Sequence, residues 1–394
     1  MGSVDTLQSM APDNADGRRE KGLFLEPQVL PDVSVVIPVK NSQRTIRATV
    51  VALLAQDYPA LAEVIVVGDV GDQTWQALAD IDDPRLVLIE HEEVHGKREP
   101  ATKRDVGLQK ARGKVLALAD SDIKMDRDWL SRGVTLLADQ RGGVVCGGMR
   151  AVDNSFWSRF VDGNTLAAKT PRVPKSYRVT VRNFGKRGRK PPIAANVIME
   201  RGVYADCPMD DEWGYGYEDY EWFWRLASTG HRILYAAGLE GAHHHRQSFR
   251  ALAWEYLVSA NGCATFVRAY PDSPLARKRR RQAVLLPLAA TAAVAGAAAA
   301  AVSGYGVLLL VVASVAATSV VSREVALARR LEAMAYVLPA LALGSLFVFS
   351  LGWRLVASGR VTVLRHIWAR PVRRLACNLP AAALPRPTEC EMAG

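Results

Sequence analysis

Short apolar runs that each stop at polar residues recur along the first third of the chain. Such runs lie at 33–37, 63–67 and 114–119, and each reads as a buried strand. Segments with helical spacing of apolar residues lie between them, at about 42–55 and 101–112. Apolar strands that alternate with helices are typical of a parallel sheet covered on both faces. The pattern therefore predicts an α/β fold with a mostly parallel sheet.

The pattern continues less regularly in the middle of the chain. Further strands are predicted at 85–89, 193–199 and 232–236, and a helix at about 249–270. The segment 172–190 carries eight basic residues and no acidic one. It is interpreted as a solvated loop or hairpin insertion, and its cations could instead bind a diphosphate, an anionic acceptor or lipid headgroups.

Polar side chains follow three of the predicted strands directly. Asn41 and Asp69 come after the first two, and Asp120 and Asp122 come after the strand at 114–119. Binding sites in such sheets lie beyond the carboxyl ends of the strands. Two carboxylates at this spacing suit Mg²⁺ or Mn²⁺, which prefer oxygen ligands. An Asp-x-Asp triplet is also common on protein surfaces, so the other motifs carry the assignment.

An acidic and aromatic stretch at 210–225 holds a second candidate site. Glu218 and Asp219 lie at the start of a predicted helix, behind Trp213 and Tyr215. Burial among aromatic rings raises the pKa of a carboxyl group towards that of a useful base. The alternative is an acidic pair that only stabilises a helix N-terminus.

Four segments carry a family resemblance when they are taken in order. They are VSVVIPVKN at 33–41, EVIVVGD at 63–69, TKRDVGLQKARGKVLALADSD at 102–122 and GYGYEDYEWFWRL at 214–226. Together they resemble the family-2 nucleotide-sugar glycosyltransferases, and the resemblance covers about residues 33–250. It implies a GT-A type, mostly parallel sheet with helices on both faces. It also implies a metal-dependent transfer that inverts the sugar's configuration.

The resemblance implies a role for individual residues. The expected donor contacts are Pro38, Asn41, Asp69, Arg104 and Asp120. Asp120 would meet the ribose and Asp122 the metal. Asp69 would pair with the base edge, and because it can accept from the N3–H of uracil, a UDP-sugar is the default donor. This chain departs from the family at Gly68, where a second acid is common, and at Asp105, where Asn is usual.

On the acceptor side, the resemblance makes Asp219 the catalytic base. Glu218, Trp213, Tyr215 and Arg225 are expected to support it or to contact the acceptor. One histidine of the run at 243–245 is expected near the metal or the diphosphate, and His244 is the residue chosen. The alternative for this run is a polar strand end with one buried histidine.

The last third of the chain predicts a membrane region. Residues 282–322 contain no charged side chain, which is enough for two helices of about 20 residues each. Spans are predicted at about 283–302 and 305–322. The basic cluster at 277–281 would lie in the cytoplasm. A third apolar segment at 333–353 either spans or lies at the interface, and a buried soluble helix is the alternative for the Ala-rich first span.

The expected organisation is a mobile tail at 1–30, a GT-A domain at 31–275 and a membrane region with a basic tail at 276–394. The formal charge is +10, and a basic cluster beside an apolar run favours a membrane over nucleic acid. The five cysteines include no Cys-x-x-Cys pair, which indicates reduced thiols.

These features predict an inverting glycosyltransferase with its catalytic domain on the cytoplasmic face of a membrane. It would use Mg²⁺ or Mn²⁺ to move a sugar from a nucleotide-diphosphate sugar to a lipid or envelope-glycan hydroxyl. One alternative is a processive polysaccharide synthase, although residues 226–282 lack the Q-x-x-R-W segment of such synthases. The other is a catalytically silent, membrane-anchored binding protein with the same fold.

Overall fold

A computed structural model of the chain provides the structure. It describes residues 30–92, 100–163, 171–186, 188–210, 213, 216–285 and 330–357. The predicted tail at 1–30 and the predicted spans at 283–302 and 305–322 lie almost wholly outside these residues.

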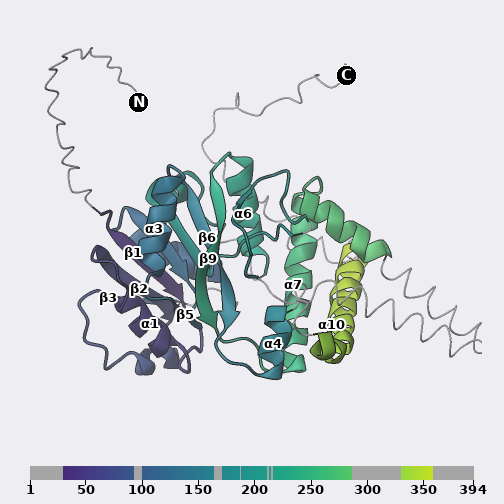
Figure 1. The fold of residues 1–394 in the computed structure, drawn as a ribbon, viewed down its shortest axis with the longest axis horizontal. Coiled ribbons are helices and arrows are strands. Elements are labelled where there is room, and N and C mark those ends of the chain that lie inside the picture. Colours follow the sequence, from purple (N-terminus) through teal and green to yellow (C-terminus); the bar gives the residue numbers. More distant parts are fainter. Residues whose placement is uncertain are drawn as a thin grey trace, which may run out of the picture. The chain divides into compact units, whose positions relative to one another are not determined.

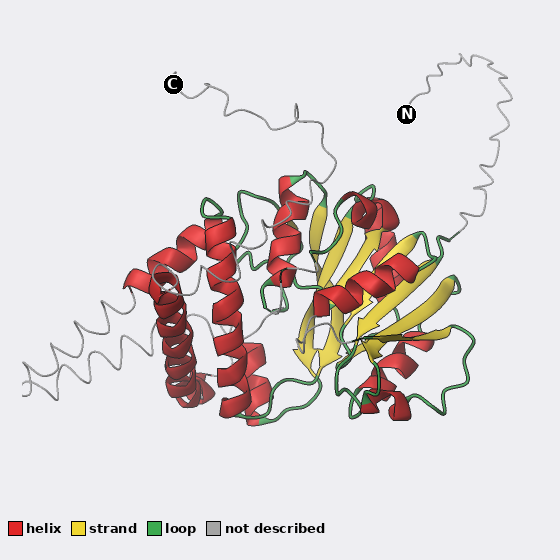
Figure 2. Ribbon diagram, turned by 180° about the vertical axis from the view of Figure 1, so that it is seen from behind, coloured by secondary structure: helices red, strands yellow, loops and turns green. Residues whose placement is uncertain are grey.

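The first half of the domain is the predicted parallel α/β unit. Its elements are β1 (Val33–Pro38), α1 (Ile46–Leu54), β2 (Leu61–Asp69), the 3₁₀ helix η1 (Gln73–Ala77), β3 (Leu86–His91), α2 (Pro100–Lys110) and β4 (Val115–Ala119). β1 pairs in parallel with β2 and β4, and β2 pairs in parallel with β3. Alternate residues of β1 enter two separate cores, Val36 one and Val35 the other. Both faces of the strand are therefore covered, which explains why it is apolar throughout (Figure 2).

The second half makes the sheet mixed. It contains β5 (Ile123–Met125), α3 (Trp129–Asp139), β6 (Val144–Ala151), α4 (Phe156–Gly163), β7 (Tyr177–Val179), β8 (Asn196–Glu200), α5 (Arg201–Asp206), α6 (Glu218–Ser228), β9 (Ile233–His243) and α7 (Phe249–Ala269). The sheet order is β3-β2-β1-β4-β8-β6-β9-β5, and β7 pairs with β9 beside this path. Figure 1 labels the strands β1, β2, β3, β5, β6 and β9. β8 runs antiparallel to both neighbours. The sheet is therefore mixed, with β1 to β4, β6 and β9 parallel and β8 reversed, because an apolar run does not encode strand direction.

β9 is longer than the predicted strand at 232–236, and a bulge interrupts it. Gly147 of β6 pairs with Ala236, but Gly148 pairs with Glu240. The extra residues include Gly238, whose φ of 76° lies in the left-handed region that favours glycine. The strand then continues to His243, which pairs with Ile123 of β5. The bulge thus lets β9 reach the carboxyl edge of β4.

Asn196 of β8 stabilises this bulge by hydrogen bonds from inside the core. It is fully buried. Its Nδ2 donates to the carbonyls of Gly148 and Leu239 at 3.0 and 3.1 Å, and its Oδ1 accepts from Trp129 Nε1 at 2.9 Å. A buried carbonyl that lost these partners would be left unsatisfied, so Asn196 stabilises the irregular pairing.

The third apolar segment, predicted at 333–353, lies in a helix, α10 (Arg330–Ala357), with Pro339 inside it. α10 packs along α7 (Figure 1). Phe347 and Leu351 join the core, and Arg354 Nη1 donates to Asn261 Oδ1 of α7 at 2.9 Å. In the described part of the chain, no helix is both long and apolar enough for a membrane span.

Candidate functional site

The candidate site is a cavity of about 910 Å³ at the carboxyl ends of β1 and β4. Several separate parts of the sequence meet there. The lining includes the loop after β1, the Asp120–Asp122 turn, the first residues of α6 and the histidines at the end of β9 and just beyond it. The structure therefore brings together the two acidic motifs that the sequence singled out.

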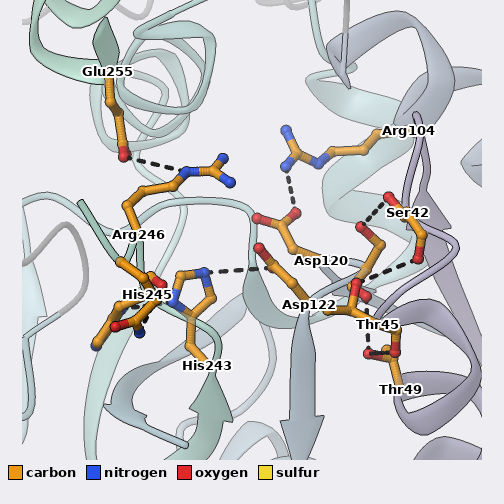
Figure 3. A network of polar contacts seen from close by, with 12 residues as sticks. Ser42, Thr45, Thr49, Arg104, Asp120, Asp122, His243, His245, Arg246 and Glu255 are labelled. Carbon is orange, nitrogen blue, oxygen red and sulfur yellow. Dashed lines mark hydrogen bonds and ion pairs between the residues drawn. The ribbon is translucent and has the colours of Figure 1, made fainter. Parts of the chain in front are cut away.

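Arg104 of α2 joins the two motifs. Its guanidinium donates through Nη2 to Asp120 Oδ1 at 2.7 Å and through Nη1 to Asp219 Oδ1 at 3.1 Å. Glu218 Oε1 lies 3.7 Å from Nη1. Burial lowers the pKa of Arg104, but the three carboxylates raise it further, so the group stays charged. One buried cation thus holds acids from two distant segments at one point. Figure 3 shows its contact with Asp120.

Asp219 Oδ1 accepts from the Arg104 guanidinium at 3.1 Å, and the Asp219 side chain is 14% exposed. Trp213 donates from Nε1 to Gly216 O at 3.2 Å and stacks near Tyr270, with ring centroids 6.4 Å apart. Trp213 therefore packs behind the loop before α6, and Tyr215 lies outside the described residues.

Glu218 and Arg225 shape α6. Glu218 is buried, and its Oε2 accepts from the backbone N–H of Gly216 at 2.8 Å. Arg225 lies two turns further along, where it donates to Glu221 Oε1 at 2.6 Å and to Cys207 Sγ at 3.2 Å. Arg225 thus supports the helix from within the core and does not line the cavity.

The Asp120–Asp122 turn faces β9. His243 Nε2 lies 3.4 Å from Asp122 Oδ1 (Figure 3). Burial raises the pKa of Asp122, but His243 lowers it more, and the net shift is downward. Burial lowers the pKa of His243, but Asp122 outweighs this effect and the pKa rises.

His244, the residue chosen from the sequence, contacts this turn differently. Its backbone N–H donates to the carbonyl of Asp122 at 3.0 Å, and its side chain is exposed. The imidazole beside Asp122 belongs to His243. The geometry therefore favours His243 over His244 as a metal ligand, because β9 ends with His243 facing the turn.

Two protein donor atoms are available for a divalent cation here. Among the described residues, no group of three or more histidine, cysteine or acidic side chains is arranged to hold a metal ion. Mg²⁺ and Mn²⁺ in nucleotide enzymes commonly bind one or two protein ligands and take the rest from phosphates and water. Asp122 Oδ1 and His243 Nε2 fit that arrangement.

Asp69 is held by two lysines. Lys103 Nζ lies 2.6 Å from Oδ1 and Lys40 Nζ lies 2.9 Å from Oδ2. Burial raises the pKa of Asp69, but hydrogen bonds from the two lysines outweigh it and lower the pKa. Both oxygens expected to face a base therefore have cationic partners, which the sequence spacing did not indicate.

The loop after β1 is tied to the Asp120–Asp122 turn. Asn41 adopts a left-handed φ of 52°, and its backbone N–H donates to Asp72 Oδ2 at 2.8 Å. Ser42 Oγ lies 2.8 Å from Ser121 Oγ. Pro38 and Asn41 line the cavity as expected. No sequence motif predicted that Asp72, Ser42 and Ser121 would make these contacts.

Comparisons with known proteins identify related sequences and a similar fold. Residues 34–206 match the family model described as Glycosyl transferase family 2. Glycosyltransferase AglE of Haloferax volcanii is 25% identical over 223 residues, which are 54% of this chain and 67% of AglE. Succinoglycan biosynthesis protein ExoO of Rhizobium meliloti is 36% identical over 126 residues, 32% of this chain and 33% of ExoO.

A third relative is WfaP of Escherichia coli, named as a UDP-Glc:alpha-D-GlcNAc-diphosphoundecaprenol beta-1,3-glucosyltransferase. It is 33% identical over 90 residues, 23% of this chain and 35% of WfaP. The chain thus spans about a third of the length of ExoO and of WfaP.

A solved structure shows the same fold. It is the mannosyltransferase PcManGT from Pyrobaculum calidifontis, in complex with GDP-Man and Mn²⁺. The TM-score is 0.52 at 21% identity, over 80% of this chain and 88% of that one. Residues 34–206 of the chain thus resemble glycosyltransferase family 2, and the fold resembles that of a solved glycosyltransferase.

Proposed function

We propose that the chain is an inverting, metal-assisted glycosyltransferase. It moves a sugar from a nucleotide-diphosphate sugar to a hydroxyl of a lipid or envelope-glycan acceptor at a membrane. The observation that carries the proposal is the Arg104 bridge, which puts Asp120 and Asp219 within reach of one bound donor.

Asp219 is the proposed base. It lies in the first turn of α6, where the helix dipole favours a carboxylate. It accepts the proton of the acceptor hydroxyl while that oxygen forms a bond to the anomeric carbon. The bond to the nucleotide diphosphate breaks on the opposite side, and the leaving group keeps the electron pair. One such displacement inverts the configuration at this carbon.

The donor side is cationic. Lys40, Lys103, Arg104 and Arg172 all line the cavity, which suits a diphosphate. A divalent cation held by Asp122 and His243 would supply further charge neutralisation for the leaving group. Ser42 and Ser121 keep the loop after β1 and the acidic turn at one spacing, and Asp120 is proposed to meet the ribose.

A UDP-sugar is the proposed donor, and its base lies near Pro38, Asn41 and Asp69. WfaP is named for a UDP-glucose donor and a diphosphoundecaprenol-linked acceptor, which supports this choice and a lipid-linked acceptor. Because Lys40 and Lys103 hold Asp69, we expect their ammonium groups to share the base contact. Lysine donates to carbonyl oxygens of uracil and guanine alike, so a donor panel decides between them.

The membrane location is supported by exposed apolar side chains on two packed helices. Trp254 of α7 is 66% exposed, and Phe349 and Trp353 of α10 are 55% and 73% exposed. Apolar surface that includes tryptophan suits the lipid–water interface. The basic cluster at 277–281 and the uncharged run after it favour a catalytic domain on the cytoplasmic face.

The test is turnover with a panel of UDP-, GDP- and dTDP-sugars under Mg²⁺ or Mn²⁺, with undecaprenyl-diphosphate-linked and glycan acceptors. We expect transfer of one or a few sugars with inversion, and its loss in Asp219→Asn. Arg225→Lys, a change inside the core away from the cavity, controls for folding. No turnover with any donor would favour the silent binding protein, and long polymer would favour the processive synthase.

A further inference from the structure

Arg246 and Glu255 form an ion pair on the wall of the cavity. Both residues line the cavity, and Arg246 Nε lies 3.7 Å from Glu255 Oε2. Arg246 lies just beyond β9, and Glu255 lies in the second turn of α7. Figure 3 shows the Arg246 side chain between Glu255 and Asp120. The pair therefore places a cation on the side of the cavity that holds the proposed metal site.

The backbone on either side of Arg246 is held by hydrogen bonds. Before it, the N–H of His244 donates to the carbonyl of Asp122 at 3.0 Å. After it, Gln247 Nε2 donates to Ser158 Oγ of α4 at 2.9 Å. The Arg246 side chain itself is 56% exposed, and exposed side chains change rotamer rapidly. The guanidinium can therefore change partner by side-chain rotation while the backbone stays in place.

Other cations of the cavity are held more firmly by carboxylates. Lys103 is 8% exposed, and its Nζ lies 2.6 Å from Asp69 Oδ1. Arg104 is 4% exposed and contacts its nearest carboxylate oxygen at 2.7 Å. The contact between Arg246 and Glu255 is longer, and exposed ion pairs are weak. Arg246 can therefore exchange its carboxylate for a phosphate with little loss of interaction energy.

The order of the strands indicates which phosphate Arg246 would meet. The proposed base contact, Asp69, ends β2, and the proposed ribose and metal contacts, Asp120 and Asp122, follow β4. β9 lies on the opposite side of β4 from β2 in the sheet, so Arg246 comes after the metal site when the cavity is followed from the base. A nucleoside diphosphate that lies across these contacts directs its β-phosphate, which carries the sugar, at Arg246. This phosphate gains negative charge when the bond to the sugar breaks, and a cation there then binds it more strongly.

We propose that Arg246 and Glu255 form a release switch for the nucleoside diphosphate that leaves after sugar transfer. The bound donor draws the Arg246 guanidinium onto its β-phosphate. After transfer, Glu255 competes for the same guanidinium and so lowers the affinity for the product. The inference rests on the proposed function for the donor site, and it adds a pair of residues whose role is to capture the leaving group and let it go.

Calorimetry on the full chain with UDP and with UMP, which lacks the β-phosphate, tests the switch in the presence of Mn²⁺. Arg246→Met should weaken UDP binding about 10–100-fold, the usual effect of losing a hydrogen bond to a charged group, and leave UMP binding unchanged. Glu255→Gln keeps the size of the side chain but removes its charge. It should tighten UDP binding about 2–5-fold, the strength of an exposed ion pair, and have no effect in an Arg246→Met background. The matched control is Arg250→Met, which removes an exposed arginine of α7 outside the cavity lining.

The outcomes separate the switch from the proposed function. Equal losses of UDP and UMP affinity in Arg246→Met would overturn the inference, as would unchanged or weaker UDP binding in Glu255→Gln. A wild-type protein that binds neither UDP, GDP nor dTDP would instead refute the donor site itself. Binding of GDP in place of UDP would refute only the choice of uracil, and the same variants measured with GDP and GMP would then decide the switch. If Arg246→Met fails to fold, Glu255→Gln still decides.

Discussion

Replacing Arg104 by Met should destabilise the protein and disconnect its two acidic motifs. The guanidinium is 4% exposed, and its partners Asp120, Asp219 and Glu218 are 30%, 14% and 8% exposed. Removing one partner of a buried ion pair costs about 3–5 kcal/mol, because the remaining charge stays buried. Asp120 is partly solvated, so we expect the lower end, about 3 kcal/mol.

Urea unfolding followed by circular dichroism measures this cost as a change in the free energy of unfolding. In an Asp219→Asn background the cost of Arg104→Met should be about 1 kcal/mol smaller, because one of the uncompensated charges is already gone. Arg104→Lys keeps the positive charge, but lysine has one side-chain nitrogen, whereas Arg104 reaches Asp120 and Asp219 with two. Compared with Arg104→Met, this variant should restore part of the lost stability and little of the lost turnover. A loss below about 1 kcal/mol in Arg104→Met, the size of an exposed pair, would refute the reasoning.

Three further predictions follow from single contacts. Asp219→Asn should lower kcat by about 10²–10⁴-fold, the usual contribution of a general base, and leave nucleotide binding by calorimetry unchanged; weakened binding would argue for a structural role. Asn196→Leu should cost about 3 kcal/mol in urea unfolding, because buried carbonyls at the bulge lose their donor; an unchanged midpoint would contradict this. The lowered pKa of Asp69 contributes stability that is present above the unfolded value and is lost as pH falls through the folded one. In Asp69→Asn the free energy of unfolding should fall less steeply as the pH is lowered. An unchanged pH dependence would mean that other carboxylates cause the loss of stability in acid.

The parallel half of the sheet could be predicted from the sequence because its strands are buried on both faces. Every residue of β1 is buried. A strand in that environment is apolar throughout, and such a run can be recognised from the sequence pattern alone. The motifs Asp120–Asp122 and Glu218–Asp219 were also found in sequence, and they do meet at one cavity. Their roles in catalysis remain predictions.

What could not be predicted depends on contacts between distant residues. Nothing local marks Lys103 as the partner of Asp69 or Asp162 as the partner of His245, since these pairs lie 34 and 83 residues apart. The direction of β8 is likewise set by the path of the chain from β6 through α4 and β7 to β8. The contact between Arg104 and Asp219 could not be predicted for a similar reason, because Arg104 lies on another helix, 115 residues away in the sequence.

The bulge in β9 decides which histidine meets the acidic turn. Relative to β6, β9 contains three additional residues, Ala237, Gly238 and Leu239. Side chains alternate between the two faces of a strand, so an odd insertion exchanges the faces of every residue beyond it. If the same residues paired with β6 without a bulge, Ala237 would lie opposite Gly148, and His244 would take the face that His243 now occupies. The bulge leaves three residues unpaired and so sets the register of the end of β9, with Glu240 opposite Gly148 and His243 opposite Ala151. Deletion of all three residues would keep this register, and His243 would still face the turn.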